Sequence, residues 1–130
     1  MNSLRLLNDA DLSRLENLLE SSTSRLTPER RDALLGFLAE TSSTRDPGEL
    51  ERRIALGDRL TLVAPLDSND WYEPEIVMPD EVDLDQDLIS VLTPVGLAVL
   101  GCRIGNRVSW ETPAGTRQMT ITSVRKHALP

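Results

Sequence analysis

The beginning of the chain carries leucines at helical spacing. Asn8 or Asp9 can cap a helix that stops at the serine-rich stretch 21–24, and its apolar positions share one face: Leu12, Leu15, Leu18 and Leu19. Thr27 followed by Pro28, a capping residue before a first-position proline, begins a second helix. Its stripe consists of Ala33, Leu34, Phe37 and Leu38. The two stripes predict a short antiparallel helical hairpin, similar to a coiled coil.

A third helix follows, and then the apolar period changes. Asp46-Pro47 repeats the cap-and-proline pattern before a helix predicted over Glu49–Leu56 and closed by Gly57. From Asp58 the period becomes two, which predicts a strand whose inner face carries Leu60, Leu62 and Ala64. We therefore expect a helical segment, 1–56, followed by a mainly β domain, 57–130.

Proline, glycine and aspartate divide the second segment into elements. Pro65 and the cluster Asp67–Asp70 predict a turn, and a strand from Trp71 to Met78 follows, which Pro74 confines to an edge or a bulge. After an acidic connector over 79–87, the pattern predicts a strand over Leu88–Leu92 and a short helix that begins at Thr93-Pro94 and stops at Gly101. The strand from Arg107 to Thr112, a turn over Thr112–Gly115 and a strand through Met119 and Ile121 form the clearest hairpin. The fold class is α+β.

Composition narrows the possible functions. The chain has 130 residues and a net charge of 14 − 21 = −7, which argues against binding to a phosphate backbone and favours partners with basic surfaces. A single cysteine, Cys102, cannot form an internal disulfide, and with one histidine, His127, it cannot complete a Cys/His zinc site. The apolar stretch within residues 1–9 is too short for the core of a signal peptide, and the apolar run Val95–Cys102 is too short to span a membrane. These features predict a cytoplasmic protein, a monomer or a weak dimer.

Each candidate catalytic or metal-binding motif lacks a partner residue. Asp83, Asp85 and Asp87 begin like a calcium loop, but Leu88 and Pro94 stand where that loop needs glycine and a bidentate acid. His127 has no nucleophile nearby in the sequence, Cys102 is expected to be buried, and no glycine-rich phosphate loop is present. We expect no catalytic residue, cofactor or metal.

The few aromatic residues suggest packing and one contact surface. Trp110 is expected on the core face of the hairpin, beside Val108. The pair Trp71-Tyr72 follows a polar turn, so one of the two is a candidate anchor for a partner.

The order of motifs between Leu88 and Gly115 is similar to a known family. The segment Leu88–Gly101, followed by Gly105, Trp110–Pro113 and Gly115, resembles the C-terminal domain of the bacterial Gre-type transcript cleavage factors (GreA/GreB). The resemblance covers roughly residues 57–125, and total length favours the regulator of nucleoside diphosphate kinase branch of that superfamily. It implies an FKBP-like antiparallel sheet with one short helix, and docking on RNA polymerase near the rim of its secondary channel.

A departure from the cleavage factors shapes the functional hypothesis. Those proteins carry an acidic pair at the tip of a long coiled coil, whereas the connection 21–26 contains no carboxylate here. The nearest acids, Glu20 and Glu29, lie back on the two helices. Glu40, in the second connection, is a weaker candidate for a metal-positioning acid. The first helix, if it covers 9–21, is only about 20 Å long. We therefore expect a non-catalytic transcription regulator that competes with Gre-type factors and contacts DNA only indirectly.

The resemblance also suggests which residues contact the polymerase. Ser90 to Pro94 align with the strand-to-helix junction of the cleavage factors, where we expect free backbone N–H groups, with the upstream acids facing basic groups. The predicted polymerase-binding set is Asp87, Ser90, Val91, Leu92, Thr93, Pro94 and Gly96. Three alternatives stay open: stimulation of transcript cleavage, prolyl isomerisation, and direct binding to nucleoside diphosphate kinase.

Overall fold

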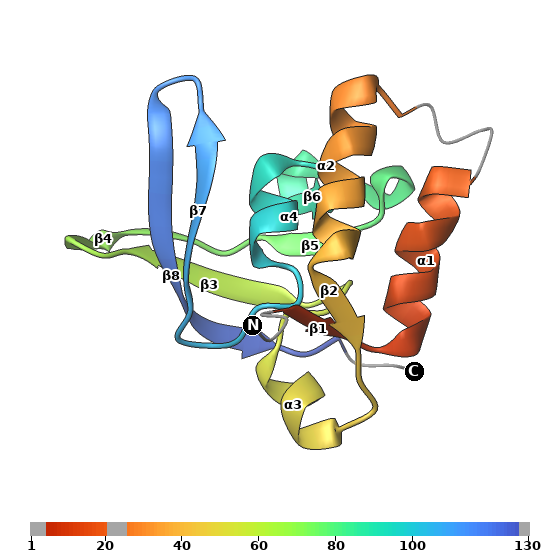
Figure 1. The fold of residues 1–130 in the computed structure, drawn as a ribbon. Coiled ribbons are helices and arrows are strands. Elements are labelled where there is room, and N and C mark those ends of the chain that lie inside the picture. Colours follow the sequence, from red (N-terminus) through yellow and green to blue (C-terminus); the bar gives the residue numbers. More distant parts are fainter. Residues whose placement is uncertain (1–4, 21–25, 128–130) are drawn as a thin grey trace.

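The computed structural model describes residues 5–20 and 26–127 as a mixed α+β protein in which helices cover one face of a curled sheet (Figure 1). The helices are α1 (Asp9–Glu20), α2 (Pro28–Ala39), α3 (Pro47–Arg52) and α4 (Pro94–Val99). The strands are β1 (Arg5–Leu7), β2 (Thr41–Ser43), β3 (Arg59–Ala64), β4 (Asp67–Tyr72), β5 (Glu75–Val77), β6 (Leu88–Ser90), β7 (Arg107–Thr112) and β8 (Gly115–Arg125). No helix in the described ranges has the length and apolarity needed to cross a membrane.

The main sheet has the order β6-β5-β3-β8-β7, with β4 also paired to β3. All its pairs are antiparallel except β5 and β6, which run parallel. An antiparallel sheet was expected, and the difference arises in the acidic connector. Its two 3-10 turns, Pro79–Glu81 and Leu84–Gln86, carry the chain back to the end of the sheet where β5 began. A crossover of this kind is needed to join parallel strands.

The predicted turn is confirmed at Pro65 and is wrong for Asp67–Asp70. The chain reverses two residues earlier, at Pro65-Leu66, and Asp67 is already the first residue of β4. Polar residues fit there because β4 pairs with β3 alone and lies at an edge of the sheet, with Asp70 forming an ion pair to Arg117 at 2.8 Å. The single strand expected over Trp71–Met78 is two strands, because the chain breaks at Pro74 between β4 and β5, and β5 pairs with both β3 and β6.

The third helix is shorter than predicted. It ends at Arg52 because the next residues pair with the segment after α4: the Ile54 N–H donates to the Cys102 carbonyl at 2.9 Å, and the Gly101 N–H donates to the Ile54 carbonyl at 2.8 Å. The buried Arg53 side chain also donates to the Gly101 carbonyl, at 2.8 Å. Gly57 is therefore a left-handed turn residue with φ of 88° rather than a helix stop.

The remaining helix and hairpin signals are confirmed. The side chains of Thr27, Asp46 and Thr93 each accept a backbone hydrogen bond at the start of a helix, and Asn8 caps α1 by accepting from the Asp11 N–H at 2.7 Å. Strands β7 and β8 pair in register from Arg107 with Thr120 to Thr112 with Gly115.

One buried cluster joins the helices to the sheet. It includes Leu15 of α1, Leu34 and Phe37 of α2, and residues of the sheet and of α4, among them Leu62, Val99 and Ile121. A short parallel pair that the sequence did not predict, β1 with β2, holds the start of the chain beside this core. The division into segments 1–56 and 57–130 stays a prediction.

Candidate docking surface

The connection between β6 and α4 is held rigidly by its own side chains. The Thr93 hydroxyl accepts from the Gly96 N–H at 3.1 Å and donates to the Ser90 carbonyl at 2.7 Å. The Ser90 hydroxyl accepts from the Leu92 N–H at 3.0 Å. The sequence folds this way because serine and threonine hydroxyls satisfy backbone groups at turns and helix starts.

Four backbone N–H groups of this connection, which we expected to be free, are bonded within the chain. The Val91 N–H donates to the Val77 carbonyl at 2.8 Å and the Thr93 N–H donates to the Ser90 carbonyl at 3.1 Å. Together with the bonds from Leu92 and Gly96 to the two hydroxyls, four N–H groups are bonded within the chain. A partner at this point therefore meets side chains, and not these four N–H groups.

Burial differs among the predicted docking residues. Val91, Leu92 and Gly96 are buried, Ser90 and Thr93 are half-buried, and Pro94 is exposed. A Cβ atom at Gly96 would lie only 2.6 Å from the Ser90 carbonyl oxygen, so Gly96 lets α4 pack against the connection. Within the connection, Pro94 is therefore the residue whose side chain is most accessible to a partner, and Asp87, at the other end of β6, is also exposed.

Asp87 lies at the other end of β6. It has φ of 57°, and its carbonyl accepts from the Glu75 N–H at 2.9 Å. Burial, and then the negative charge of Asp87, raise the pKa of the Tyr72 hydroxyl above its ordinary value. The Asp83 carboxylate accepts from the Asp85 N–H at 3.1 Å and so stabilises the local turn. In the part of the chain that the structure describes, no three His, Cys, Asp or Glu side chains are grouped to hold a metal ion.

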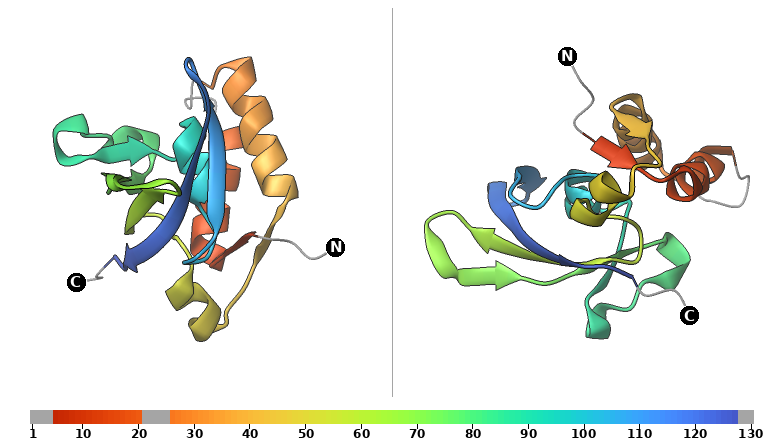
Figure 2. Two further views of the ribbon diagram at one scale, coloured as in Figure 1. Left: turned by 90° about the vertical axis from the view of Figure 1, so that its left-hand side faces the viewer. Right: turned by 90° about the horizontal axis from the view of Figure 1, so that it is seen from below.

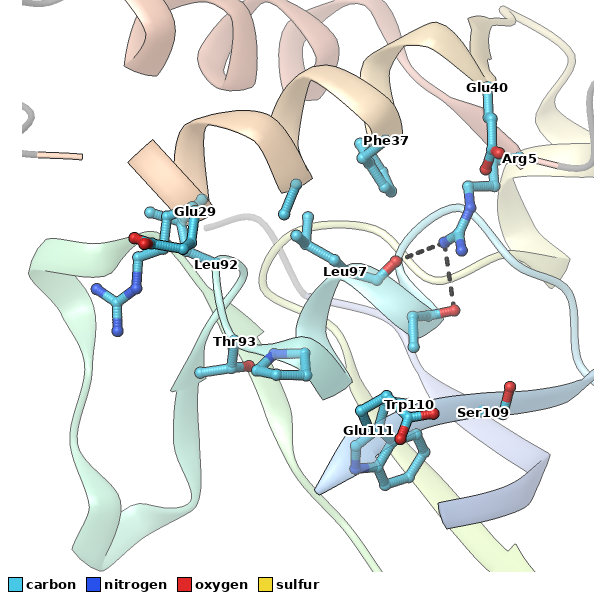
Figure 3. Close-up of a pocket in the computed structure, with 14 residues that line it drawn as sticks. Arg5, Glu29, Phe37, Glu40, Leu92, Thr93, Leu97, Ser109, Trp110 and Glu111 are labelled. Atoms are coloured by element: carbon cyan, nitrogen blue, oxygen red, sulfur yellow. Dashed lines mark hydrogen bonds between the residues drawn. The ribbon is translucent and has the colours of Figure 1, made fainter. Parts of the chain in front are cut away.

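A groove of about 600 Å³ runs between α2, α4 and β7 (Figure 3). Its apolar surface comes from all three elements: Ala33, Phe37, Leu92, Pro94, Leu97, Ala98 and Trp110. Charged and polar residues also line it: Arg5, Glu29, Arg30, Glu40, Thr93, Ser109 and Glu111. The groove thus includes Leu92, Thr93 and Pro94 of the predicted docking set, but its lining does not include Asp87.

Arg5 fixes one end of this groove. Its guanidinium donates to the carbonyls of Leu97, Ala98 and Leu100 at 2.6, 3.2 and 3.0 Å, and it lies 5.1 Å from the centre of the Phe37 ring. These bonds satisfy carbonyls at the end of α4, which have no partner within so short a helix. Arg5 therefore joins β1, α2 and α4 in one arrangement.

The sequence did not predict this groove, because its walls come from three distant segments. Trp110 packs against the core, as expected, but it is only half-buried and also lines the groove. The position of Trp110 in β7 could have indicated its partial exposure. Trp110 shares a face with the buried Val108, but it lies nearer the end of the hairpin. Nothing in the local sequence indicated that α2 would lie opposite.

The other candidate residues occupy separate places. Trp71 is 58% exposed on β4, whereas Tyr72 is half-buried, so Trp71 is the exposed member of the pair. Cys102 is buried as expected, and this burial raises the pKa of its thiol. His127 is exposed, and its backbone N–H donates to Asp58 at 2.8 Å.

The carboxylate-free connection between the first two helices lies mostly outside the described residues, at 21–25. Glu29 and Glu40 mark the two ends of the groove along α2. Glu40 follows Glu29 by eleven positions, a rise of about 16 Å along a helix, so the two do not form a carboxylate pair.

The arrangement of β6, a Thr-Pro connection, α4 and the β7–β8 hairpin is that of a Gre-type C-terminal domain, so the class is that of transcription-elongation-factor-like proteins. Residues 50–126, more than half of the chain, match the family model described as transcription elongation factor, GreA/GreB, C-term. The chain belongs to this family, as a Gre-type superfamily member close to the regulator of nucleoside diphosphate kinase.

Similar sequences and structures agree with this assignment. The regulator of nucleoside diphosphate kinase of Escherichia coli is 28% identical over 110 residues, covering 85% of this chain and 79% of that protein. Transcription elongation factor GreA of Thermodesulfovibrio yellowstonii is 31% identical over 80 residues, covering 61% of this chain and only 50% of that protein. The solved GreA/GreB structure from Nitrosomonas europaea has a TM-score of 0.74 and 28% identity, covering 94% of this chain and 98% of that one.

A more distant likeness concerns the fold alone. The GreA factor homologue 1 of Thermus thermophilus has a TM-score of 0.52 and 23% identity, covering 94% of this chain and 99% of that one.

Proposed function

We propose that this protein binds RNA polymerase at the rim of the secondary channel and acts there as a non-catalytic regulator that competes with Gre-type factors. The observation that carries the proposal is the rigid Thr93-Pro94 connection with Pro94 exposed, at the place where the family resemblance puts the polymerase contact. Membership of the GreA/GreB family supports it. The net charge of −7 favours a basic protein partner over direct contact with nucleic acid.

The proposal does not include transcript cleavage, because the connection between the first two helices carries no acidic pair. A metal-positioning tip needs at least two oxygens close together. The connection 21–26 has no acidic residue, and Glu29 and Glu40 lie at opposite ends of α2. The protein therefore occupies the channel entrance without supplying a metal ligand to the polymerase.

A titration against core RNA polymerase tests the docking connection. A Thr93→Ala, Pro94→Ala double variant should bind at least about tenfold more weakly than wild type, because it loses the exposed proline and loosens the connection. Thr93→Ser, which keeps the capping hydroxyl, should bind like wild type. The matched control is Pro65→Ala, Ser68→Ala, with Pro65 on the exposed β3–β4 turn and Ser68 at an exposed position of β4.

Thermal unfolding of the double variant shows whether weaker binding comes from a lost contact or from a lost fold. Removing the Thr93 cap should lower the free energy of unfolding by only about 1 kcal/mol, so a larger loss would indicate unfolding. Equal affinity of the double variant and wild type, with both folded, would place the contact elsewhere. Absence of wild-type binding at micromolar concentration would overturn the proposed function itself.

The groove supports a second candidate, prolyl isomerisation, which the expected FKBP-like fold also implies. Two of the chain's four aromatic residues, Phe37 and Trp110, line one apolar groove, and the activity needs such a site. However, fold does not determine function, and Arg5 already lies over the Phe37 ring. An isomerisation assay on a proline-containing peptide decides between the two. Acceleration by the wild type that is lost in Trp110→Ala would support prolyl isomerase activity, and no acceleration by the wild type would rule this activity out.

A further inference from the structure

We propose that the groove between α2, α4 and β7 is part of the polymerase-docking surface, and that it takes a basic segment of the polymerase carrying a bulky apolar side chain. This inference rests on the proposed function. It adds that α2, from the helical part of the chain, supplies one wall of the binding site. The docking surface then extends beyond the Thr93-Pro94 connection to α2.

The shape and lining of the groove fit one or two large side chains. Its volume of about 600 Å³ is within the range typical of ligand sites. Ala33 on one wall is small and exposed, while Trp110 on the facing strand is only half-buried. Burying Trp110 and Leu97 under a partner's side chain removes apolar surface from water, which is the usual source of binding energy at an interface centre.

The charges around the groove favour a basic occupant. Glu29 on α2 and Glu111 on β7 are exposed on opposite sides, and Arg30, which follows Glu29 in the sequence, is the exposed cation of the lining. The other lining cation, Arg5, has its guanidinium bonded to three carbonyls of the segment 97–100. A lysine or arginine on either side of the inserted apolar residue would meet Glu29 and Glu111, and the overall charge of −7 attracts such a segment.

The position of the groove links it to the predicted contact. Thr93 and Pro94 belong to its lining, at the end near Glu29, while Arg5 and Glu40 lie at the other end (Figure 3). A partner surface that touches Pro94 is therefore already at the mouth of the groove. One continuous partner segment can contact both features.

Blocking the groove from α2 tests the inference without altering the connection. Ala33→Arg places a long cation in the groove, and we expect at least about a tenfold loss of affinity for core RNA polymerase. The matched control is Ala39→Arg, which adds the same side chain at an exposed position of α2 outside the groove lining. It should bind within about twofold of wild type.

Charge variants provide a second, independent readout. Glu29→Gln, Glu111→Gln should weaken binding and reduce its dependence on salt concentration, because the variant removes two rim charges. Glu16→Gln, on an exposed site of α1, should change neither. The inference is overturned if wild type binds, the Thr93/Pro94 variant does not, and Ala33→Arg binds as tightly as Ala39→Arg. If wild type itself fails to bind, the proposed function falls first.

Discussion

Asp11 is a buried carboxylate on the first helix that connects the two parts of the chain. It is 6% exposed, and its Oδ2 accepts from the Leu56 N–H at 3.0 Å. Burial raises the pKa of Asp11, with a smaller upward contribution from Asp58; the Leu56 hydrogen bond and the charges of Arg14 and Lys126 act in the opposite direction. The folded protein therefore holds the Asp11 proton more tightly than the unfolded chain does.

This raised pKa has a defined effect on stability. The contribution of Asp11 is fully present below its unfolded pKa of about 4, and it is lost as pH rises through the higher pKa of the folded state. Asp11→Asn keeps an acceptor for the Leu56 N–H but cannot ionise. Relative to wild type, the free energy of unfolding of Asp11→Asn should therefore increase between about pH 4 and pH 7.

Urea unfolding at several pH values measures this difference. A difference between Asp11→Asn and wild type that stays constant, or that decreases as pH rises, would contradict the pKa direction assigned to Asp11. Asp11→Ala, which also removes the acceptor, should be less stable than Asp11→Asn throughout, by about 1–3 kcal/mol.

Much of the residue-scale structure was predictable because it is local. The capping roles of Thr27, Asp46 and Thr93 depend only on neighbours within three residues, and all three are confirmed. The burial of Asp11 was missed, although it follows from position: Asp11 is four residues before Leu15 and seven before Leu18, which places it on the apolar face of α1. A carboxylate on such a face is a signal of a specific buried contact.

At the scale of elements, two helical glycines differ in the space around them. A Cβ at Gly96 of α4 would lie 2.6 Å from the Ser90 carbonyl oxygen and 2.8 Å from that of Val91, whereas a Cβ at Gly36 of α2 would meet no atom within 4 Å. Gly96 is thus required for α4 to approach β6 closely. Gly36 occupies open helix surface.

The same substitution should therefore change stability in opposite directions. Gly96→Ala should lower the free energy of unfolding by about 1–3 kcal/mol, because backbone atoms must move. Gly36→Ala should raise it by about 0.5–1 kcal/mol through helix propensity and a smaller unfolded-state entropy. Denaturant titration of both variants checks this, and a destabilised Gly36→Ala or a neutral Gly96→Ala would contradict the packing described for α4.

Errors in the predicted elements occurred where tertiary contacts override local patterns. The chain leaves α3 at Arg52 because Arg53 and Ile54 bond to Gly101 and Cys102, almost fifty residues later. The polar stretch Asp67–Asp70 is a strand because β3 offers it a partner, and its outer edge is free for polar side chains. Neither contact is visible in a local window of sequence.

At the scale of the whole molecule, the groove that we propose as a docking surface is built by helices and sheet together. Figure 2 shows that α2 and α4 lie on the same side of the sheet as the start of the chain. The motifs on β6, α4 and β7 carried the family resemblance, and family membership is confirmed for residues 50–126. The groove depends on how α2 lies against these motifs, so its existence required the structure.

Competition between this protein and a Gre-type factor for core RNA polymerase tests the central claim most directly. The labelled protein is titrated with polymerase at several fixed concentrations of the Gre-type factor. Mutually exclusive binding predicts that the apparent Kd rises in proportion to the competitor concentration and that no ternary complex forms. An unchanged Kd, with both proteins bound to the same polymerase, would show that this protein does not occupy the secondary-channel rim.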